Sequence, residues 1–312
     1  MRRLHATLSA LLLIAALIAL ALAAAPAAAD FETGRAAYRA GEYSAAIDAW
    51  RAPAEAGEPA AQFALGTLYV TGEGVEQDFA EAASWFQKAA EQGHASSQYN
   101  LGLILDQGWT GMPDSEVAAE WWRKAAAQHH AGAAYQLGLQ NEHGWGVEPD
   151  ITEAIRWYEQ AAGHNYASAQ YTLGLIYATG RGVVPDAAMA AAWYRKAADQ
   201  DLAEAAYNLG VLYFNGEGVA EDHTAAARLY LQAAEKGHIE AQNNLAGMYA
   251  LGIGIAQDLV HAYMWSTLAV DEDADLAEEN RARLAKLMSA EQIAHGERLA
   301  QAWQPRQPAA GE

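Results

Sequence analysis

Tryptophan and histidine side chains are concentrated between residues 109 and 145, and they are the first candidates for chemistry in this chain. Histidine can transfer protons or bind a metal, whereas tryptophan dominates the hot spots of protein interfaces. His129 and His130 are adjacent, so on a helix they would point to different faces and would not converge on one ion. His94, His130 and His238 fall where one predicted helix ends and the next begins, a place that favours capping of a helix C-terminus over metal binding. We therefore expect no metal and no cofactor.

No sequence motif for catalysis accompanies these residues. The chain lacks H-E-x-x-H, G-x-S-x-G and phosphate-loop motifs, and it contains no cysteine for a zinc site or a disulfide. The recurring G-x-G, as in Gly180-Arg181-Gly182, joins one predicted helix to the next and follows no strand, so it is not a nucleotide-binding fingerprint. The sequence predicts a binding protein and no enzyme.

These residues belong to a unit that repeats every 36 residues. A Leu-Gly pair begins at Leu65, Leu101, Leu137, Leu173 and Leu209, and Leu245-Ala246 continues the series. An aspartate column keeps the same step at Asp78, Asp114, Asp150, Asp186, Asp222 and Asp258, and a tryptophan column holds Trp85, Trp121, Trp157, Trp193, Leu229 and Trp265. A fixed period of this length indicates stacked helical hairpins, none of which can bury its apolar face alone.

The unit from Ala169 to Gln200 indicates how each hairpin is built. Its first half has apolar residues at helical spacing and predicts a first helix of about three turns, which we call helix A. Two glycines form the loop, and Asp186 is predicted to cap a second helix, helix B. Gly174 lies inside helix A, where glycine costs about 1 kcal/mol relative to alanine, so its recurrence predicts a contact too close for a methyl group. We expect the tryptophan column, including Trp193, to fill the space between units.

Polar residues follow helix A at one height and form a candidate site for an extended peptide. The position before each leucine holds Asn100, Gln136, Thr172, Asn208 and Asn244, and the position seven later holds Gln107, His143, Thr179 and Asn215. Amides repeated at one height along helix A could bond the backbone of an extended peptide. The alternative is that these side chains are only solvated. Trp109 and Trp145, in predicted loops, are likewise either recognition residues or structural ones.

The columns resemble the Sel1-like repeat family, a longer-looped relative of the tetratricopeptide repeat. The match is carried by LGTLYVTGEGVEQDFAEAASWFQKAA from Leu65 to Ala90 and by LGVLYFNGEGVAEDHTAAARLYLQAA from Leu209 to Ala234. The resemblance implies an all-α, right-handed superhelical solenoid of antiparallel helix pairs that binds a protein or peptide on its concave face. The alternative is a penicillin-binding or β-lactamase-like relative, but those relatives carry cysteine pairs that this chain lacks.

The N-terminus predicts export. Residues 1–29 place two arginines before an uncharged run and end in Ala27-Ala28-Ala29, the order of a secretory signal peptide. We expect cleavage after Ala29 and a periplasmic or secreted product; an uncleaved membrane anchor is the alternative. No other membrane association is expected.

The acidic composition restricts the partner. Without the leader the chain has 17 basic and 39 acidic residues, a net charge of −22. Such a surface repels nucleic acid and would attract a basic protein or peptide, although the charge could equally serve only solubility. The product is expected to be a monomer.

The chain divides into five predicted parts. The signal peptide covers residues 1–29, an N-terminal capping hairpin 30–57, six repeats 58–273, C-terminal capping helices 274–303 and a disordered tail 304–312. Terminal hairpins of such arrays cap the apolar ends of the stack.

Overall fold

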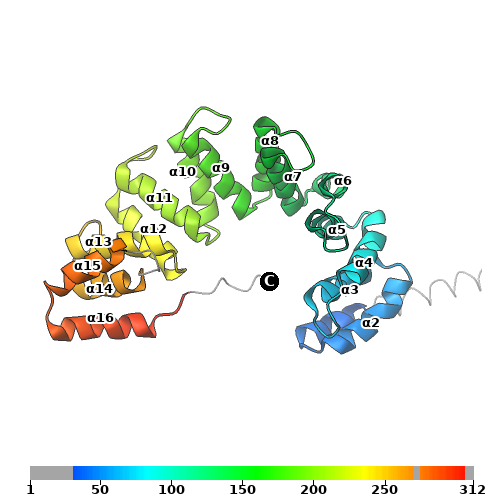
Figure 1. Ribbon diagram of the computed structural model, residues 1–312, viewed down its shortest axis with the longest axis horizontal. Helices are drawn as coiled ribbons and strands as arrows, with labels where there is room; N and C mark the ends of the chain where they lie inside the picture. Colours follow the sequence, from blue (N-terminus) through cyan, green and yellow to red (C-terminus); the bar gives the residue numbers. More distant parts are fainter. Residues whose placement is uncertain (1–30, 270–274, 306–312) are drawn as a thin grey trace, which may run out of the picture. The chain divides into compact units, whose positions relative to one another are not determined.

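The computed structural model describes residues 31–269 and 275–305, and all regular structure in these ranges is helical, with no strand among them (Figure 1). The all-α prediction is therefore confirmed. The predicted leader and most of the predicted tail lie outside the described residues.

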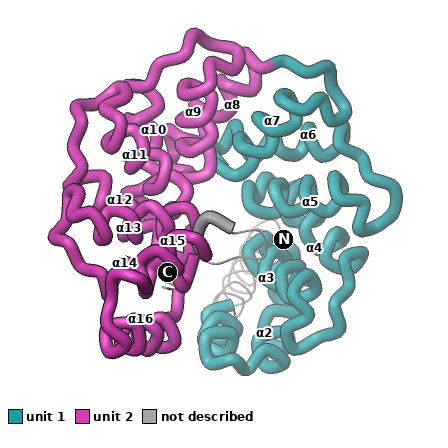
Figure 2. Tube along the Cα trace, turned by 60° about the vertical axis from the view of Figure 1, so that its left-hand side comes forward, with its two compact units in different colours: residues 1–150 teal, residues 151–312 magenta. Residues whose placement is uncertain are grey.

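The chain forms two compact units, residues 1–150 and 151–312 (Figure 2). The first unit contains a helix over residues 31–39 and then α2 Tyr43–Glu55, α3 Pro59–Thr71, α4 Phe79–Glu91, α5 Ala95–Gln107, α6 Ser115–Ala126 and α7 Ala131–His143. The second contains α8 Ile151–Gly163, α9 Ala167–Thr179, α10 Ala187–Ala198, α11 Ala203–Asn215, α12 His223–Glu235, α13 Ile239–Leu251, α14 Leu259–Leu268, α15 Asp275–Ala285 and α16 Ala290–Ala302. Successive helices pack together from α2 to α7 in the first unit and from α8 to α15 in the second, and α16 packs on α14.

Helix A and helix B begin and end where the sequence signals predict. In the fourth repeat, α9 ends at Gly180, whose φ of 73° lies in the left-handed region that glycine tolerates. Asp186 caps α10, because its carboxylate accepts hydrogen bonds from the backbone N–H groups of Ala188 and Met189 at 2.9 Å. The loop between them is closed by a backbone bond of 2.8 Å from the N–H of Asp186 to the carbonyl of Tyr177.

The same closing bond recurs in every repeat. The backbone N–H of each capping aspartate donates to a carbonyl nine residues earlier, at Tyr69, Leu105, Asn141, Tyr177, Tyr213 and Tyr249. Because a backbone carbonyl accepts this bond, the change from tyrosine to leucine or asparagine at two of these positions leaves the loop intact.

The buried aromatic column lies one residue beyond the predicted one. Trp121, Trp157 and Trp193 are only half-buried, and Lys196 lies over the Trp193 ring at 3.8 Å. The buried residues are Phe86, Trp122, Tyr158, Tyr194 and Tyr230. One helical position turns a side chain by about 100°, which moves it from the edge of the core to its centre. The side chains of the tryptophan column therefore lie at the edge of the core, except for Trp85 and Trp265, which are buried.

The buried ring explains the recurring glycine in helix A. A Cβ atom built on Gly174 would lie 2.4 Å from two ring atoms of Tyr194, and one on Gly102 would lie 2.4 Å from Trp122. The predicted close contact is therefore confirmed, and its partner is the ring of the helix B in the same repeat.

Buried glutamines connect one repeat to the next. Gln62, Gln98, Gln170 and Gln242 are almost fully buried, and each amide donates to a backbone carbonyl eight residues earlier, at the end of the preceding helix B, at 3.0–3.2 Å. A buried amide without such a partner would be strongly destabilising. These bonds fix the spacing between successive hairpins, a role that the sequence patterns did not predict.

Candidate functional site

The predicted polar column lies on helix A and is half-buried throughout: Asn100 on α5, Gln136 on α7, Thr172 on α9, Asn208 on α11 and Asn244 on α13. Part of this column already binds the neighbouring repeat. The amide of Asn208 donates to the hydroxyl of Tyr171 at 3.4 Å. Burial raises the pKa of Tyr207, and the nearby amide of Asn244 offsets part of that rise. These two amides therefore connect successive repeats through a tyrosine hydroxyl.

In the described part of the first unit, the amides of this column make no such hydrogen bonds to the preceding repeat. Position 63 is phenylalanine, so Asn100 has no hydroxyl to bind on the preceding repeat, and among the described residues its side chain makes no hydrogen bond. Gln136 likewise keeps its amide unbonded within the described ranges. The two amides available to a partner therefore lie on α5 and α7.

The second set of polar residues lies at the last position of helix A and is exposed. Gln107 bonds the carboxylate of Asp106 at 3.3 Å, and Asn215 bonds Glu217 at 2.9 Å. The ring of His143 lies 4.7 Å from the ring of Trp145, centroid to centroid. These contacts are all local, so the side chains border the loops and do not extend the half-buried column.

Each of the two loop tryptophans packs against a neighbouring ring and is about half exposed to solvent. Trp109 packs on Phe79 of the preceding repeat, with centroids 4.6 Å apart, yet 47% of it is exposed. Trp145 packs on His143 and is 48% exposed. Large apolar side chains are normally buried, so two indoles fixed in place with a free face are suited to hold a partner. Met112, in the same loop as Trp109, is 89% exposed and was missed by the sequence patterns.

The histidines cap helix A and not helix B, which corrects the sequence interpretation. Nδ1 of His94 accepts the N–H of Ser97, Nδ1 of His130 accepts that of Ala133, and Nδ1 of His238 accepts that of Ala241, at 3.2–3.4 Å. Each is the residue before helix A, where an acceptor satisfies a free N–H group. Accepting requires the neutral ring, and burial lowers the pKa of His94 and His130.

No group of three or more metal-binding side chains occurs in the described ranges. Nor does any described helix combine the length and hydrophobicity needed to cross a bilayer.

Family comparison identifies the architecture. The Sel1 repeat model matches six consecutive segments, residues 59–94, 95–130, 131–166, 167–202, 203–238 and 239–273. The chain belongs to the Sel1 repeat family. The six matched segments are the six helix pairs from α3 to α14, and Sel1 repeats are generally scaffolds for protein interactions.

Two solved structures support this assignment. A Sel1 repeat protein from Oxalobacter formigenes is 35% identical with a TM-score of 0.66, over 79% of this chain and 98% of that one. A protective antigen present in uropathogenic Escherichia coli strains, which displays an SLR fold, is 34% identical with a TM-score of 0.75 over 88% of this chain. The chain spans 60% of that antigen's length. A comparison with curated proteins found no match.

Proposed function

We propose that this Sel1 repeat protein is an exported, non-catalytic adaptor that holds a protein or peptide partner on the helix A face of its repeats. The observation that carries the proposal is the pair of half-exposed indoles, Trp109 and Trp145, each fixed by a ring contact in the first unit. Fixed aromatic side chains lose little conformational entropy when a partner covers them, which is the property of an interface hot spot.

Two amides of the same unit would add polar contacts. Asn100 and Gln136 occupy the same position on α5 and α7 and keep their hydrogen-bonding groups available. An extended peptide offers a backbone donor or acceptor at each residue, so repeated amides can bind it with little dependence on its sequence. Apolar side chains of the partner would then cover the indoles.

Export and charge define the expected partner. The leader pattern in residues 1–29 supports a periplasmic location, with secretion as a second outcome. The net charge of −20 for the full chain favours a partner with a basic surface, because opposite charges accelerate association.

The test is crosslinking in the intact periplasm followed by capture of the protein, comparing the native chain with a Trp109→Ala, Trp145→Ala variant. We expect the double variant to lose one specific partner band while its helical circular dichroism stays unchanged. The matched control is Val184→Ala, since Val184 is an 84% exposed loop residue of the fourth repeat. Unchanged capture by the double variant would contradict the proposed surface, and robust hydrolysis of nitrocefin by the purified protein would contradict a non-catalytic role.

A further inference from the structure

Each regular repeat contains a pair of aromatic rings, one from each helix. Phe63 lies 5.8 Å from Phe86, Tyr171 lies 5.8 Å from Tyr194, and Tyr207 lies 5.9 Å from Tyr230, measured between ring centroids. The helix B ring of each pair covers the glycine of helix A. The pair therefore fills the space between the two helices of a repeat.

The sixth repeat has neither ring. Asn243 stands 36 residues after Tyr207, and Ser266 stands 36 residues after Tyr230. The glycine of the pair is replaced by Ala246, whose methyl group occupies only a small part of the lost ring volume. Unlike the preceding five repeats, this repeat has no facing ring pair, and the buried rings of its second helix are those of Tyr263 and Trp265.

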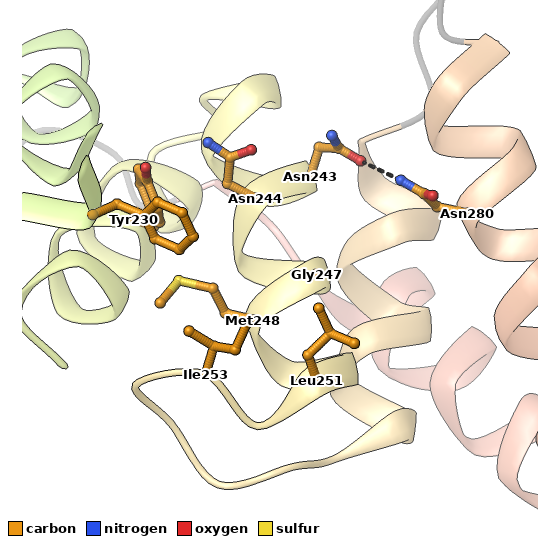
Figure 3. Close-up of a pocket in the computed structure, with 9 residues that line it drawn as sticks. Tyr230, Asn243, Asn244, Gly247, Met248, Leu251, Ile253 and Asn280 are labelled. Carbon is orange, nitrogen blue, oxygen red and sulfur yellow. Dashed lines mark hydrogen bonds between the residues drawn. The ribbon is translucent and has the colours of Figure 1, made fainter. Parts of the chain in front are cut away.

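Two adjoining cavities occupy the region around the missing rings. One, of about 270 Å³, is lined by residues that include Tyr230, Asn244 and Met248, and its neighbour, of about 290 Å³, is lined by Ala246, Ser266 and Leu284 among others. Both are bordered by Gly247, Leu251 and Asn280, which Figure 3 labels around the first cavity. Gly247 replaces the leucine or valine of the four preceding repeats, and a Cβ built on it would meet no atom within 4 Å. The missing side chain keeps the entrance open.

Polar groups in these cavities are placed to bind a ligand. Ser266 is 0% exposed and lines the second cavity, and its hydroxyl has no hydrogen-bond partner among the described residues. A buried hydroxyl without a partner destabilises the fold, so a ligand that bonds it is favoured. At the border, the Asn280 amide donates to Asn243 at 3.3 Å, as Figure 3 shows.

We infer that the sixth repeat accepts a tyrosine or tryptophan side chain of the bound partner in the place of its own missing rings. The ring would enter past Gly247 and lie between α13, α14 and α15, with its phenol or indole N–H bonded to the Ser266 hydroxyl. Each cavity is just below the range of about 300–1,000 Å³ typical of pockets for small molecules, which suits a single side chain. This inference rests on the proposed function, since it names one side chain of the partner.

The test uses N-acetyl-L-tyrosinamide and N-acetyl-L-tryptophanamide as probes, with N-acetyl-L-leucinamide for comparison, titrated into the full chain and followed by amide NMR shifts. We expect both aromatic probes to shift the signals of Gly247 and Leu251 in a saturable manner. Equal binding of the leucine probe, or no saturable shift with the aromatic probes, would overturn the inference.

Variants that restore the regular repeat give the decisive comparison. Ala246→Gly with Ser266→Tyr reinstates the ring over the glycine, and Gly247→Leu separately reinstates the side chain found in the second to fourth repeats. Each should weaken binding of the aromatic probes by at least about tenfold, or about 1.4 kcal/mol. The matched control, Thr67→Leu, makes the corresponding change in α3 and should leave binding unaltered. If both filled variants bind the aromatic probes as well as the native chain does, the site is refuted. Partner capture is measured on the same variants. If they lose the probes but still capture the partner through Trp109 and Trp145, the proposed function stands independently of this site.

Discussion

Replacing Gly174 by alanine is the most direct test of how the repeats pack. The added methyl carbon would lie 2.4 Å from two carbons of the Tyr194 ring, whereas carbon atoms attract at about 3.5–4.0 Å. The ring would therefore have to retreat by more than about 1 Å. Tyr194 is only 3% exposed and lies against Tyr171, so its retreat displaces other core atoms.

Two opposing energies decide the outcome. Overpacking a filled core costs about 1–3 kcal/mol, and exchanging glycine for alanine inside a helix recovers up to about 1 kcal/mol. Because the ring is confined on its far side, we expect the packing cost to exceed the helix gain and the second unit to lose about 1–2 kcal/mol.

Gly247→Ala is the matched control, since it makes the same change inside a helix A where a Cβ meets nothing within 4 Å. This variant should gain up to about 1 kcal/mol. Urea unfolding followed by circular dichroism gives both values, with hydrogen exchange of α9 and α10 to detect local opening, because repeat arrays can unfold in parts. A Gly174→Ala protein as stable as the native one would refute the close-packing argument.

A double-mutant cycle adds a second criterion. Gly174→Ala combined with Tyr194→Ser recreates the Ala246 and Ser266 pair of the sixth repeat. The methyl group should cost less once the ring is gone, with a coupling of about 1–3 kcal/mol. Additive effects would show that the two positions do not share one space.

Two further predictions concern the helix caps. Burial lowers the pKa of His130 in the folded chain. As the pH falls below about 6.5, the unfolded chain therefore binds the proton first, and stability should fall until the pH reaches the folded pKa. Above about pH 6.5 this group should make no difference to stability. His130→Asn, which retains a capping acceptor that does not titrate, should reduce the acid-dependent fall of the melting temperature, and an unchanged pH profile would contradict this assignment. Asp186→Ala removes bonds to two N–H groups and should cost about 1 kcal/mol in urea unfolding, whereas Asp186→Asn should cost less; equal losses would indicate that charge, and not capping, matters.

The repeat period determined most of the fold from sequence alone. Columns such as Asp186 and Gly174 identify where a helix must begin and where two helices must touch, and both are local or nearest-neighbour requirements. In a repeat array nearly every contact joins adjacent elements, so a periodic sequence contains almost all the information that stacking needs.

The candidate site was less predictable. The sequence located Trp109 and Trp145 but not the ring contacts that fix them, and it treated Asn208 as free although its amide binds a tyrosine of the preceding repeat. The signal for the sixth-repeat cavities was present, since Asn243 and Ser266 interrupt two aromatic columns. It could be recognised only once those columns were known to face each other.

The sequence by itself determined the helix boundaries, the number of repeats and the glycine that must lie against a ring. Only the tertiary structure decided that the ring belongs to Tyr194 and not Trp193, and that buried amides such as Gln170 tie one hairpin to the next. The reason is geometric. Period and capping depend on the order of residues along one helix, whereas burial depends on the rotation of each helix about its axis, which is set by the neighbour it packs against.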